Sequence, residues 1–363
     1  MKRIYLAVYN DLTFDQRMKR ICTTLSLHFD VVLVGKETKH MPPLIPELNY
    51  TQYRIRCRFS NGKRSYIEFN IRLFFFLLFK RMDALCAIDL DTILPCYFIS
   101  KWRNIPRVYD AHELFTEMKE VVTRPLVRKI WRAVERYCVP RFPNGYTVSD
   151  SIASEFLRRY GVNYTVIRNL PLERNNGGPA ASRNKLIIYQ GAINEARGLE
   201  ALIPAMKQVD AELHIYGRGN FEQMLILLIN RYKVKDKVHV HAPVNPTVLK
   251  TITDHAYIGI NLVENTGLNQ FYSLANKFFD YMHSGVPQVT MRYPEYQAVN
   301  AKFEIAVLID DLDPNRVAEA INSLLNNPAL YTRLHKNCLD AKKFYNWQQE
   351  ERKLIDFYNK LLL

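Results

Sequence analysis

The sequence predicts an α/β protein of two domains, each built on a doubly wound parallel sheet. With 363 residues, the chain is longer than one ordinary α/β core requires. Short β-rich runs alternate with amphipathic stretches, which is the pattern of successive βαβ units and of Rossmann-like domains. This alternation is interrupted once, by a polar stretch rich in Gly, Pro and Asn that is typical of a linker.

The first domain is predicted over residues 1–168, and the linker over residues 169–183. The stretches between the β-rich runs of this domain are long enough to hold the crossover connections that parallel strands require. The runs themselves occupy residues 4–8, 31–34, 84–88, 107–109 and 146–148.

The second domain is predicted over residues 184–345, where the same alternation restarts. Its β-rich runs occupy residues 186–189, 213–216, 238–240, 258–262, 288–290 and 306–309. In residues 346–363, Ile355, Tyr358 and Leu361 follow helical spacing, and no strand comes after them. We therefore expect a terminal helix that packs back toward the first domain.

The charge is the first informative departure from an average globular chain. There are 50 Lys and Arg against 36 Asp and Glu, a formal net charge of +14. Such a field attracts nucleic acid, anionic lipid or phosphorylated small molecules, and composition alone does not choose among them. The longest apolar run, residues 73–79, is far shorter than the ~20 residues of a membrane-spanning helix. The sequence therefore predicts a cytoplasmic protein.

The strongest chemical signal is the stretch YSLANKFFDYMHSGVPQV, which begins at Tyr272. A helix from about residue 275 to 283 would begin with free backbone N–H groups and a positive dipole end, which suit a phosphate. Ser273 and Asn276 would add donors, and Lys277 a full charge. Asp280, one turn further on, is placed to bind a vicinal diol such as a ribose.

Periodicity by itself favours a plainer interpretation, an amphipathic helix whose aromatic residues lie in the core. The stretch resembles, however, the donor-binding motif of the GT4 family of retaining glycosyltransferases. These enzymes have the GT-B architecture, in which two Rossmann-like domains face a central cleft and a C-terminal helix crosses back. The resemblance implies that Asp280 binds the nucleotide ribose and that the loop around Ser273 and Leu274 holds the diphosphate. Tyr272 stands where many members have a second Glu.

A second candidate segment follows the predicted strand at 107–109 and contains Asp110, His112 and Glu113. Three titratable groups at one strand end can shift one another's pKa values, although a capped loop explains any one of them. The segment resembles the Asp-Ala-His-Glu stretch of the same GT4 branch. By that resemblance His112 is a catalytic residue that faces the donor, with Glu113 beside it.

The first turn of the second domain, YQGAINEARGL from Tyr189, is the third match. Gly191 allows a close approach of the backbone, and Arg197 opens the next helix. A lone Arg at a helix start is usually solvated, so this segment counts only together with the other two. Family members carry a basic residue near Arg197 that neutralises the diphosphate, and many have an Arg where this chain has Ala192. The resemblance therefore makes Arg197 and Lys277 the catalytic cations.

Weaker matches extend the resemblance over nearly the whole chain and assign the acceptor side. The turn after the first predicted strand resembles a D-x-R form of the family's acceptor loop and contains Asp15 and Arg17. Asp89, after the run at 84–88, resembles a loop near the same cleft. Asp89 and Asp91 have the spacing of a metal-binding D-x-D motif but belong to the wrong domain for donor phosphates. We therefore expect no metal.

Two basic stretches of the first domain, residues 54–81 and 124–141, interleave with apolar residues. The second combines Arg128 and Arg132 with Trp131 at helical spacing, which suits a surface helix on anionic lipid. An ordinary core-facing helix with a charged outer face explains the same pattern equally well. Because the first domain binds the acceptor in GT-B enzymes, the resemblance implies a glycan or lipid-linked acceptor. The two basic stretches, placed in this domain, favour peripheral contact with an anionic membrane at its inner face.

Together these features predict a retaining, metal-independent hexosyltransferase of cell-surface polysaccharide or glycoconjugate assembly. It would use a nucleotide-sugar donor, a UDP- or GDP-sugar, with no cofactor and no nucleic-acid partner. Two alternatives stay open: a nucleotide-sugar epimerase of the same architecture, and a non-catalytic protein that binds nucleotides or nucleic acid. Tyr272 and Ala192 also leave room for an inactive relative. A Rossmann oxidoreductase is disfavoured because no G-x-G-x-x-G follows the first predicted strand.

Overall fold

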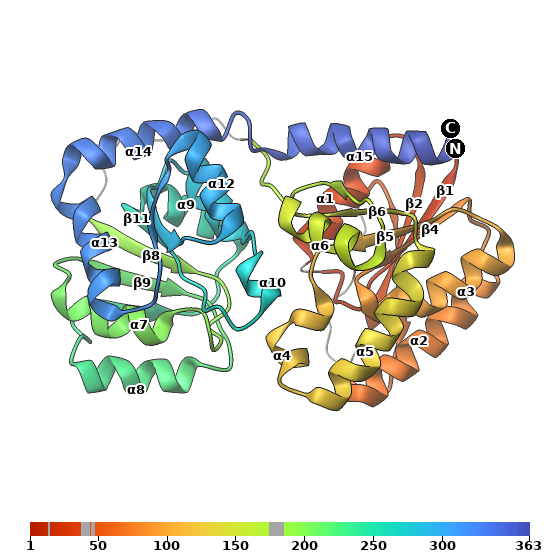
Figure 1. Ribbon diagram of the computed structural model, residues 1–363, viewed down its shortest axis with the longest axis horizontal. Coiled ribbons are helices and arrows are strands. Elements are labelled where there is room, and N and C mark those ends of the chain that lie inside the picture. Colours follow the sequence, from red (N-terminus) through yellow and green to blue (C-terminus); the bar gives the residue numbers. More distant parts are fainter. Residues whose placement is uncertain (14, 38–43, 45–47, 174–184) are drawn as a thin grey trace. The chain divides into compact units, whose positions relative to one another are not determined.

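The structure is a computed structural model that describes residues 1–13, 15–37, 44, 48–173 and 185–363. The chain divides into two compact units, shown in Figure 1 with helices on both faces of each sheet. The first unit contains Met1–Asn169 together with Gln349–Leu363, and the second contains Leu170–Gln348. Most of the predicted linker, residues 174–183, lies outside the described residues.

The first unit is built on a seven-stranded parallel sheet with the order β3-β2-β1-β4-β5-β6-β7. Five of its strands overlap the predicted runs. The other two, β3 and β7, were not predicted, because β3 alternates basic and aromatic residues at a sheet edge and β7 has only two residues. The strands are β1 (Arg3–Ala7), β2 (Asp30–Glu37), β3 (Thr51–Arg56), β4 (Ala84–Ile88), β5 (Arg107–Ala111), β6 (Asn144–Thr147) and β7 (Thr165–Val166).

Helices cover this sheet, and the C-terminal helix α15 (Trp347–Leu362) packs on it with two aromatic side chains. The ring centroid of Phe357 lies 5.5 Å from that of Tyr146, and the buried Tyr358 lies 6.2 Å from Phe29. The other helices are α1 (Gln16–Leu25), α2 (Gly62–Leu78), α3 (Ile93–Arg103), α4 (Lys119–Val122), α5 (Pro125–Cys138) and α6 (Asp150–Tyr160).

The second unit has a six-stranded parallel sheet with the order β10-β9-β8-β11-β12-β13, and each strand coincides with a predicted run. The strands are β8 (Leu186–Gln190), β9 (Glu212–Tyr216), β10 (Val238–His241), β11 (Ile258–Asn261), β12 (Gln288–Met291) and β13 (Ala306–Ile309). The helices are α7 (Leu199–Ala205), α8 (Glu222–Tyr232), α9 (Pro246–His255), α10 (Leu268–Phe271), α11 (Asn276–His283), α12 (Pro294–Phe303), α13 (Pro314–Asn326) and α14 (Pro328–Ala341).

Both sheets confirm the predicted doubly wound α/β class, and both have a topological switch point. In the first unit the strand order reverses between β1 and β4, and in the second between β8 and β11. Ligands of such sheets bind outside the carboxyl ends of the strands at this point. The candidate residues predicted from the sequence follow β1, β4, β5, β8 and β11, so the topology gathers them at these two places.

Two features of the chain bear on its environment. All six cysteines are free and buried. Among the described residues, no helix is both long enough and apolar enough to pass through a lipid bilayer.

Candidate functional site

The second unit's candidate site is organised by helix α11, which begins at Asn276 after the loop that contains Ser273 and Leu274. The residue before the helix, Ala275, has an extended backbone and contributes no side-chain cap. The hydroxyl of Tyr296 accepts a hydrogen bond from the Ala275 N–H at 3.1 Å. The same hydroxyl lies 3.3 Å from that of Ser273, so one buried tyrosine holds the loop in place.

Lys277 is the unusual residue of this helix, because its ammonium nitrogen is buried and has no hydrogen-bond partner in the described structure. Nζ lies over the ring of Tyr189, 3.7 Å from the centroid. Burial lowers the pKa of Lys277 well below its ordinary value, and the positive charge of Arg197 lowers it further. The neighbours of this ammonium are an aromatic face and a second cation, so it lacks a negative counter-charge. A bound anion would supply that charge.

Gly191, just past the end of β8, lies next to the end of the Lys277 side chain. Its φ of +121° is one that L side chains rarely adopt, and a Cβ added there would come within 3.9 Å of Lys277 Nζ. Gly191 donates its N–H to the carbonyl of Tyr216 at 3.0 Å, which ties the end of β8 to the end of β9. The absence of a side chain at Gly191 therefore leaves no Cβ in contact with the end of the Lys277 side chain.

Arg197 reaches the same region from the loop before α7. The next residue, Gly198, has a φ of +72°, and a Cβ there would lie 2.4 Å from Cβ of Leu262. Only glycine therefore lets α7 begin against the end of β11, with Arg197 directly before it. Arg197 is half-buried, and its charge acts on both Lys277 and Tyr189.

Asp280 lies one turn after Lys277 and is held by a chain of hydrogen bonds. Its Oδ2 accepts from Nε2 of Gln190 at 3.0 Å. The side-chain oxygen Oε1 of Gln190 in turn accepts from the Thr253 hydroxyl at 2.7 Å. This second-unit carboxylate is therefore fixed to the end of β8, on the same helix as Lys277.

The first unit has a candidate site of different character, in which acidic groups and a histidine meet at the ends of β4 and β5. Nε2 of His112 lies 3.1 Å from Oδ2 of Asp89. Asp89 adopts a φ of 57°, and its N–H donates to the carbonyl of Asp110 at 3.0 Å. The unfavourable backbone of Asp89 turns its side chain toward His112.

Burial acts against charge on both members of this pair. It raises the pKa of Asp89, as does the nearby carboxylate of Glu113, and it lowers the pKa of His112. The pKa of Asp91 is likewise raised by burial and by Glu113. A neutral imidazole can position a hydroxyl group or a sugar by hydrogen bonding. Nδ1 of His112 has no partner among the described residues and is free for that purpose.

The predicted acceptor residues Asp15 and Arg17 are both occupied within the first unit. Asp15 caps α1 by accepting from the Met18 N–H at 2.9 Å. Arg17 is buried and pairs with the buried Asp110 through Nη2 and Oδ1 at 2.7 Å. Nε and Nη1 of Arg17 have no hydrogen-bond partner within the described parts of the chain, so this guanidinium is only partly satisfied. Arg17 balances the negative charge of Asp110. Burial raises the pKa of Asp110, and the charge and hydrogen bond of Arg17 act to lower it.

The second unit matches the model of a known protein family. Residues 175–340 match the family model described as Glycosyl transferases group 1. This match covers nearly all of the second unit, including Gly191, Arg197, Lys277 and Asp280. A comparison with curated protein sequences finds no match.

Solved glycosyltransferase structures share the fold over the whole chain. A sucrose-phosphate synthase from Thermosynechococcus elongatus has a TM-score of 0.80 at 16% identity, with 99% of each chain covered. The Anabaena protein Alr3699/HepE in complex with UDP-glucose has a TM-score of 0.78 at 11% identity, over 99% of this chain and 100% of the other. WaaG, a glycosyltransferase of lipopolysaccharide biosynthesis, has a TM-score of 0.74 at 12% identity, over 97% and 98%. The chain therefore has the GT-B fold of these enzymes.

The group 1 glycosyltransferase match does not reveal several residues that the structure adds to the site. Tyr189 lies beneath Lys277, Gln190 holds Asp280, and Tyr296 holds the loop before α11. The polar Gln190 at the end of an otherwise apolar strand was a signal the sequence offered. The two tyrosines have no such signal, because buried tyrosines are common in α/β cores.

Proposed function

We propose that this protein is a retaining, metal-independent glycosyltransferase that moves a hexose from a nucleoside diphosphate sugar to a hydroxyl group. The acceptor is a glycan or a lipid-linked glycan of cell-surface polysaccharide or glycoconjugate assembly. The observation that carries the proposal is the ammonium of Lys277, which has no hydrogen-bond partner among the residues described and lies beside Gly191 and near Arg197. The solved structures of HepE with UDP and with UDP-glucose support UDP as the first donor nucleotide to test, with GDP as the second.

The chemistry assigned to these cations is stabilisation of the leaving group. When the bond between the sugar and the diphosphate breaks, negative charge develops on the phosphate oxygen that departs. Lys277 and Arg197 are already in place before this charge appears, so they need no reorganisation to meet it. Asp280, held by Gln190, would accept hydrogen bonds from the ribose, while Ser273, Leu274 and the start of α11 hold the phosphates.

The first unit is assigned the sugar and the acceptor. His112, kept neutral by burial and oriented by Asp89, would act as the catalytic hydrogen-bonding group toward the sugar, with Glu113 beside it. Asp89 and the partly satisfied Arg17 would bind the acceptor, and Asp15 supports Arg17 by capping its helix. The retaining outcome follows from the resemblance to GT4 enzymes and is part of the proposal.

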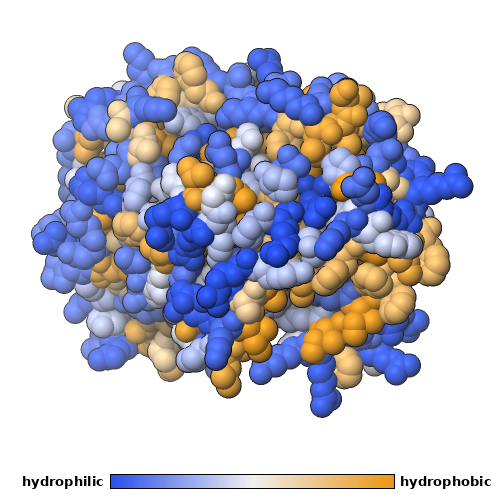
Figure 2. All heavy atoms as spheres, turned by 45° about the vertical axis from the view of Figure 1, so that its right-hand side comes forward, coloured by the Kyte–Doolittle hydropathy of each residue, from blue (hydrophilic) through white to orange (hydrophobic). Residues whose placement is uncertain are grey.

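The surface of the first unit supports a membrane-linked acceptor. Helix α2 exposes Ile67, Ile71, Phe75 and, just past its end, Phe79, by 53 to 80% of their area. The four residues are spaced four apart and therefore share one face of the helix, here called the apolar face. Figure 2 shows hydrophobic side chains gathered in the lower part of the view, at the height where Figure 1 labels α2 and α3. A large exposed apolar patch on a strongly basic protein suits an anionic lipid surface.

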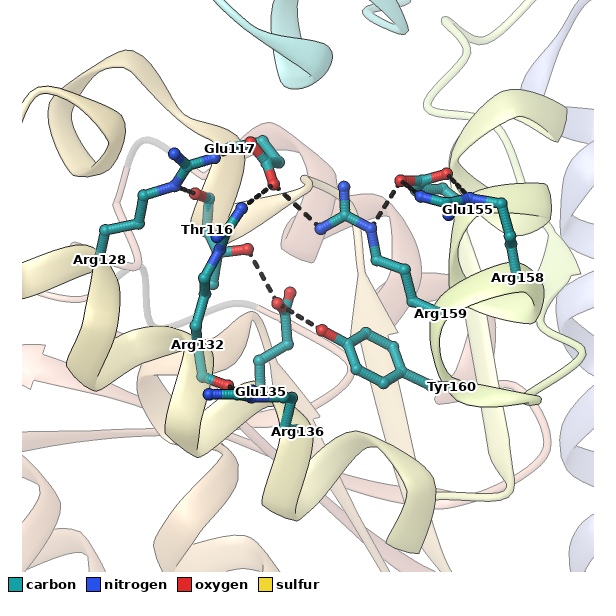
Figure 3. A network of polar contacts seen from close by, with 10 residues as sticks. All are labelled: Thr116, Glu117, Arg128, Arg132, Glu135, Arg136, Glu155, Arg158, Arg159 and Tyr160. Atoms are coloured by element: carbon teal, nitrogen blue, oxygen red, sulfur yellow. Dashed lines mark hydrogen bonds and ion pairs between the residues drawn. The ribbon is translucent and has the colours of Figure 1, made fainter. Parts of the chain in front are cut away.

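A basic hollow of about 930 Å³ lies in the same unit. Figure 3 shows how buried Glu117 gathers three guanidinium groups, those of Arg128 at 2.6 Å, Arg159 at 3.0 Å and Arg132 at 3.1 Å. Burial opposes charge on Glu117, but the hydrogen bonds from arginine outweigh it and lower its pKa. One carboxylate thus preorders several cations, and the lining carries an excess of positive charge for phosphate groups. Its basic residues are Arg128, Lys129, Arg132, Arg136, Arg158 and Arg159.

The donor site is tested by binding of UDP, GDP and their sugars, followed by thermal unfolding with and without a chelator. One diphosphate should raise the melting temperature by mass action, with no effect of chelator. Asp280→Asn keeps an acceptor for Gln190 but loses the carboxylate, so it should weaken that nucleotide. It should have little effect on an analogue that lacks both ribose hydroxyls, and Asp210→Asn, an exposed control in the same unit, should change neither.

Transfer is then measured with the donor identified in this way and a radiolabelled sugar. Incorporation into a lipid-extractable or polymeric product supports the transferase. Conversion of the sugar nucleotide without any acceptor would instead establish the epimerase. If no nucleotide binds, the donor site as proposed is wrong, and binding to nucleic acid becomes the next measurement.

The membrane contact has its own test, sedimentation with vesicles of neutral lipid or of neutral lipid mixed with an anionic phospholipid. Binding should need the anionic lipid and weaken with salt. Replacing Phe75 and Phe79 together by Glu should abolish it and leave nucleotide binding intact. Ile226→Glu, at an equally exposed apolar position of the second unit, is the matched control. Equal sedimentation of wild type and double variant would refute this contact.

A further inference from the structure

Three histidines and a glutamate gather at one edge of the second unit's sheet, apart from the residues assigned to the donor. Glu212 and His214 lie on β9, while His239 and His241 lie on β10, the edge strand beside it. Nothing in the proposed transfer reaction uses these four side chains.

The strand geometry places all four on the same face. Side chains alternate along a strand, so Glu212 and His214 share a face, as do His239 and His241. The parallel register pairs His239 directly with His214. Their neighbours Leu213 and Ile215 point the other way into the core, which fixes the polar side chains outward.

Three atoms of this group converge at distances suited to a metal ion. Oε2 of Glu212 lies 3.2 Å from Nε2 of His214 and 3.7 Å from Nε2 of His239. Zinc binds such atoms at about 2.0–2.2 Å, so two tetrahedral ligands are about 3.3 Å apart. Among the described residues, Glu212, His214 and His239 are the one group of three or more His, Cys, Asp or Glu residues whose ligand atoms all lie within 4.8 Å of one another.

His241 completes the arrangement from behind. Its Nε2 lies 3.0 Å from Nδ1 of His214. At this distance Nε2 of His241 can accept a hydrogen bond from the Nδ1–H of His214. The His241 ring also stacks on Tyr216, with centroids 4.4 Å apart, so its orientation is fixed. An acceptor at Nδ1 leaves the lone pair of His214 Nε2 directed at the ligand position, as is usual around metal-bound histidine.

We infer that Glu212, His214 and His239 form a binding site for a divalent transition-metal ion of the zinc class, oriented by His241. Two imidazoles and a carboxylate are the ligands that such ions prefer, and the exposed side of Glu212 leaves room for water at the remaining position. The ion would join β10 to β9 and so stabilise the edge of the second sheet. His214 pairs with Ile188, two residues before Gln190 on β8, and none of the three ligands is among the residues proposed to hold the donor.

The test is titration of the untagged full chain, freed of metal by a chelator and dialysed, with Zn²⁺ and with Co²⁺. Calorimetry should show one equivalent of Zn²⁺, and bound Co²⁺ should show the visible absorption of a site with four or five ligands. Zn²⁺ should also raise the melting temperature, because it binds only the folded sheet. The double variant His214→Gln/His239→Gln should lose all three effects.

Two further variants separate metal binding from a general loss of structure. His241→Phe keeps the stacking on Tyr216 but removes the acceptor, so it should weaken Zn²⁺ binding by about 10- to 100-fold without changing the melting temperature of the metal-free protein. His255→Gln, whose ring bonds the Thr251 carbonyl elsewhere on the unit, should bind Zn²⁺ as the wild type does. The site is refuted if the wild type binds no stoichiometric Zn²⁺ or Co²⁺. It is also refuted if the double variant binds as tightly as the wild type.

Discussion

Nζ of Lys277 lies 3.7 Å from the centre of the Tyr189 ring, and that ring is its only favourable neighbour in the described structure. A cation–π contact stabilises a desolvated ammonium by about 2 kcal/mol. This is less than the free energy that the ammonium loses when it leaves water. Charging Lys277 in the free protein is therefore unfavourable, at the place where the donor diphosphate is proposed to bind. Binding energy from the phosphates would offset this cost, and the cation would remain available for the departing charge.

Replacing Lys277 by Met should separate binding from stability. Met fills the same space without a charge, so the free energy of unfolding of the nucleotide-free protein should stay the same or rise. Affinity for the nucleoside diphosphate should fall, and kcat should fall about 100-fold or more, as for loss of one preorganised donor. Chemical unfolding and transfer assays measure the two effects, and Lys207→Met, at an exposed position, is the control. A less stable variant with normal turnover would contradict this role.

The same residue should make stability depend on pH. Because burial lowers the pKa of Lys277 in the folded protein, the unfolded chain holds this proton more tightly. Between the lowered pKa and the ordinary lysine value of about 10.4, folding releases a proton, and stability should rise with pH. The difference in melting temperature between wild type and Lys277→Met isolates this contribution from other titrating groups. The melting temperature of the wild type should rise relative to that of the variant as pH rises through that window. A difference that does not change with pH would refute the lowered pKa of Lys277.

Gly198 should tolerate no side chain. Alanine there would adopt an unfavourable left-handed backbone and place its Cβ 2.4 Å from that of Leu262. We expect Gly198→Ala to lower the free energy of unfolding by about 3 kcal/mol, from backbone strain and overpacking together. Gly161 has a similar φ of +69° but nothing near its added Cβ, so Gly161→Ala should cost only about 1–2 kcal/mol. Equal losses measured by urea unfolding would show that contact with Leu262 is unimportant.

Arg17 should be required for stability as well as for the acceptor. Arg17→Met leaves Asp110 buried without its counter-ion, which should cost about 3–5 kcal/mol of unfolding free energy. Adding Asp110→Asn removes the uncompensated charge and should recover part of this loss. Arg158→Met breaks an ion pair whose arginine is mostly exposed, and should cost less than about 1 kcal/mol. If the first variant is as stable as the wild type, the pair contributes nothing and Arg17 is free for another role.

Much of the fold could be predicted because its signals are local. Eleven predicted β-rich runs coincide with strands of the structure, since each run of β-branched and aromatic residues indicates a strand without knowledge of its partners. Strands β3 and β7 escaped prediction, since a half-exposed edge strand and a two-residue strand carry little of that signal. The predicted helix at 275–283 also forms, with Phe278 and Phe279 in the core as the plainer interpretation required.

The sequence by itself determined the doubly wound class, the order of its elements and the residue types that follow each strand. Only the tertiary structure decided which of them meet. Gln190 and Asp280 are 90 residues apart, and Arg17 and Asp110 are 93 apart, yet both pairs form hydrogen bonds. The proposed metal site likewise depends on the pairing of His239 with His214. Such contacts are set by the register of parallel strands and by the packing of helices on them, neither of which is encoded in the spacing along the chain.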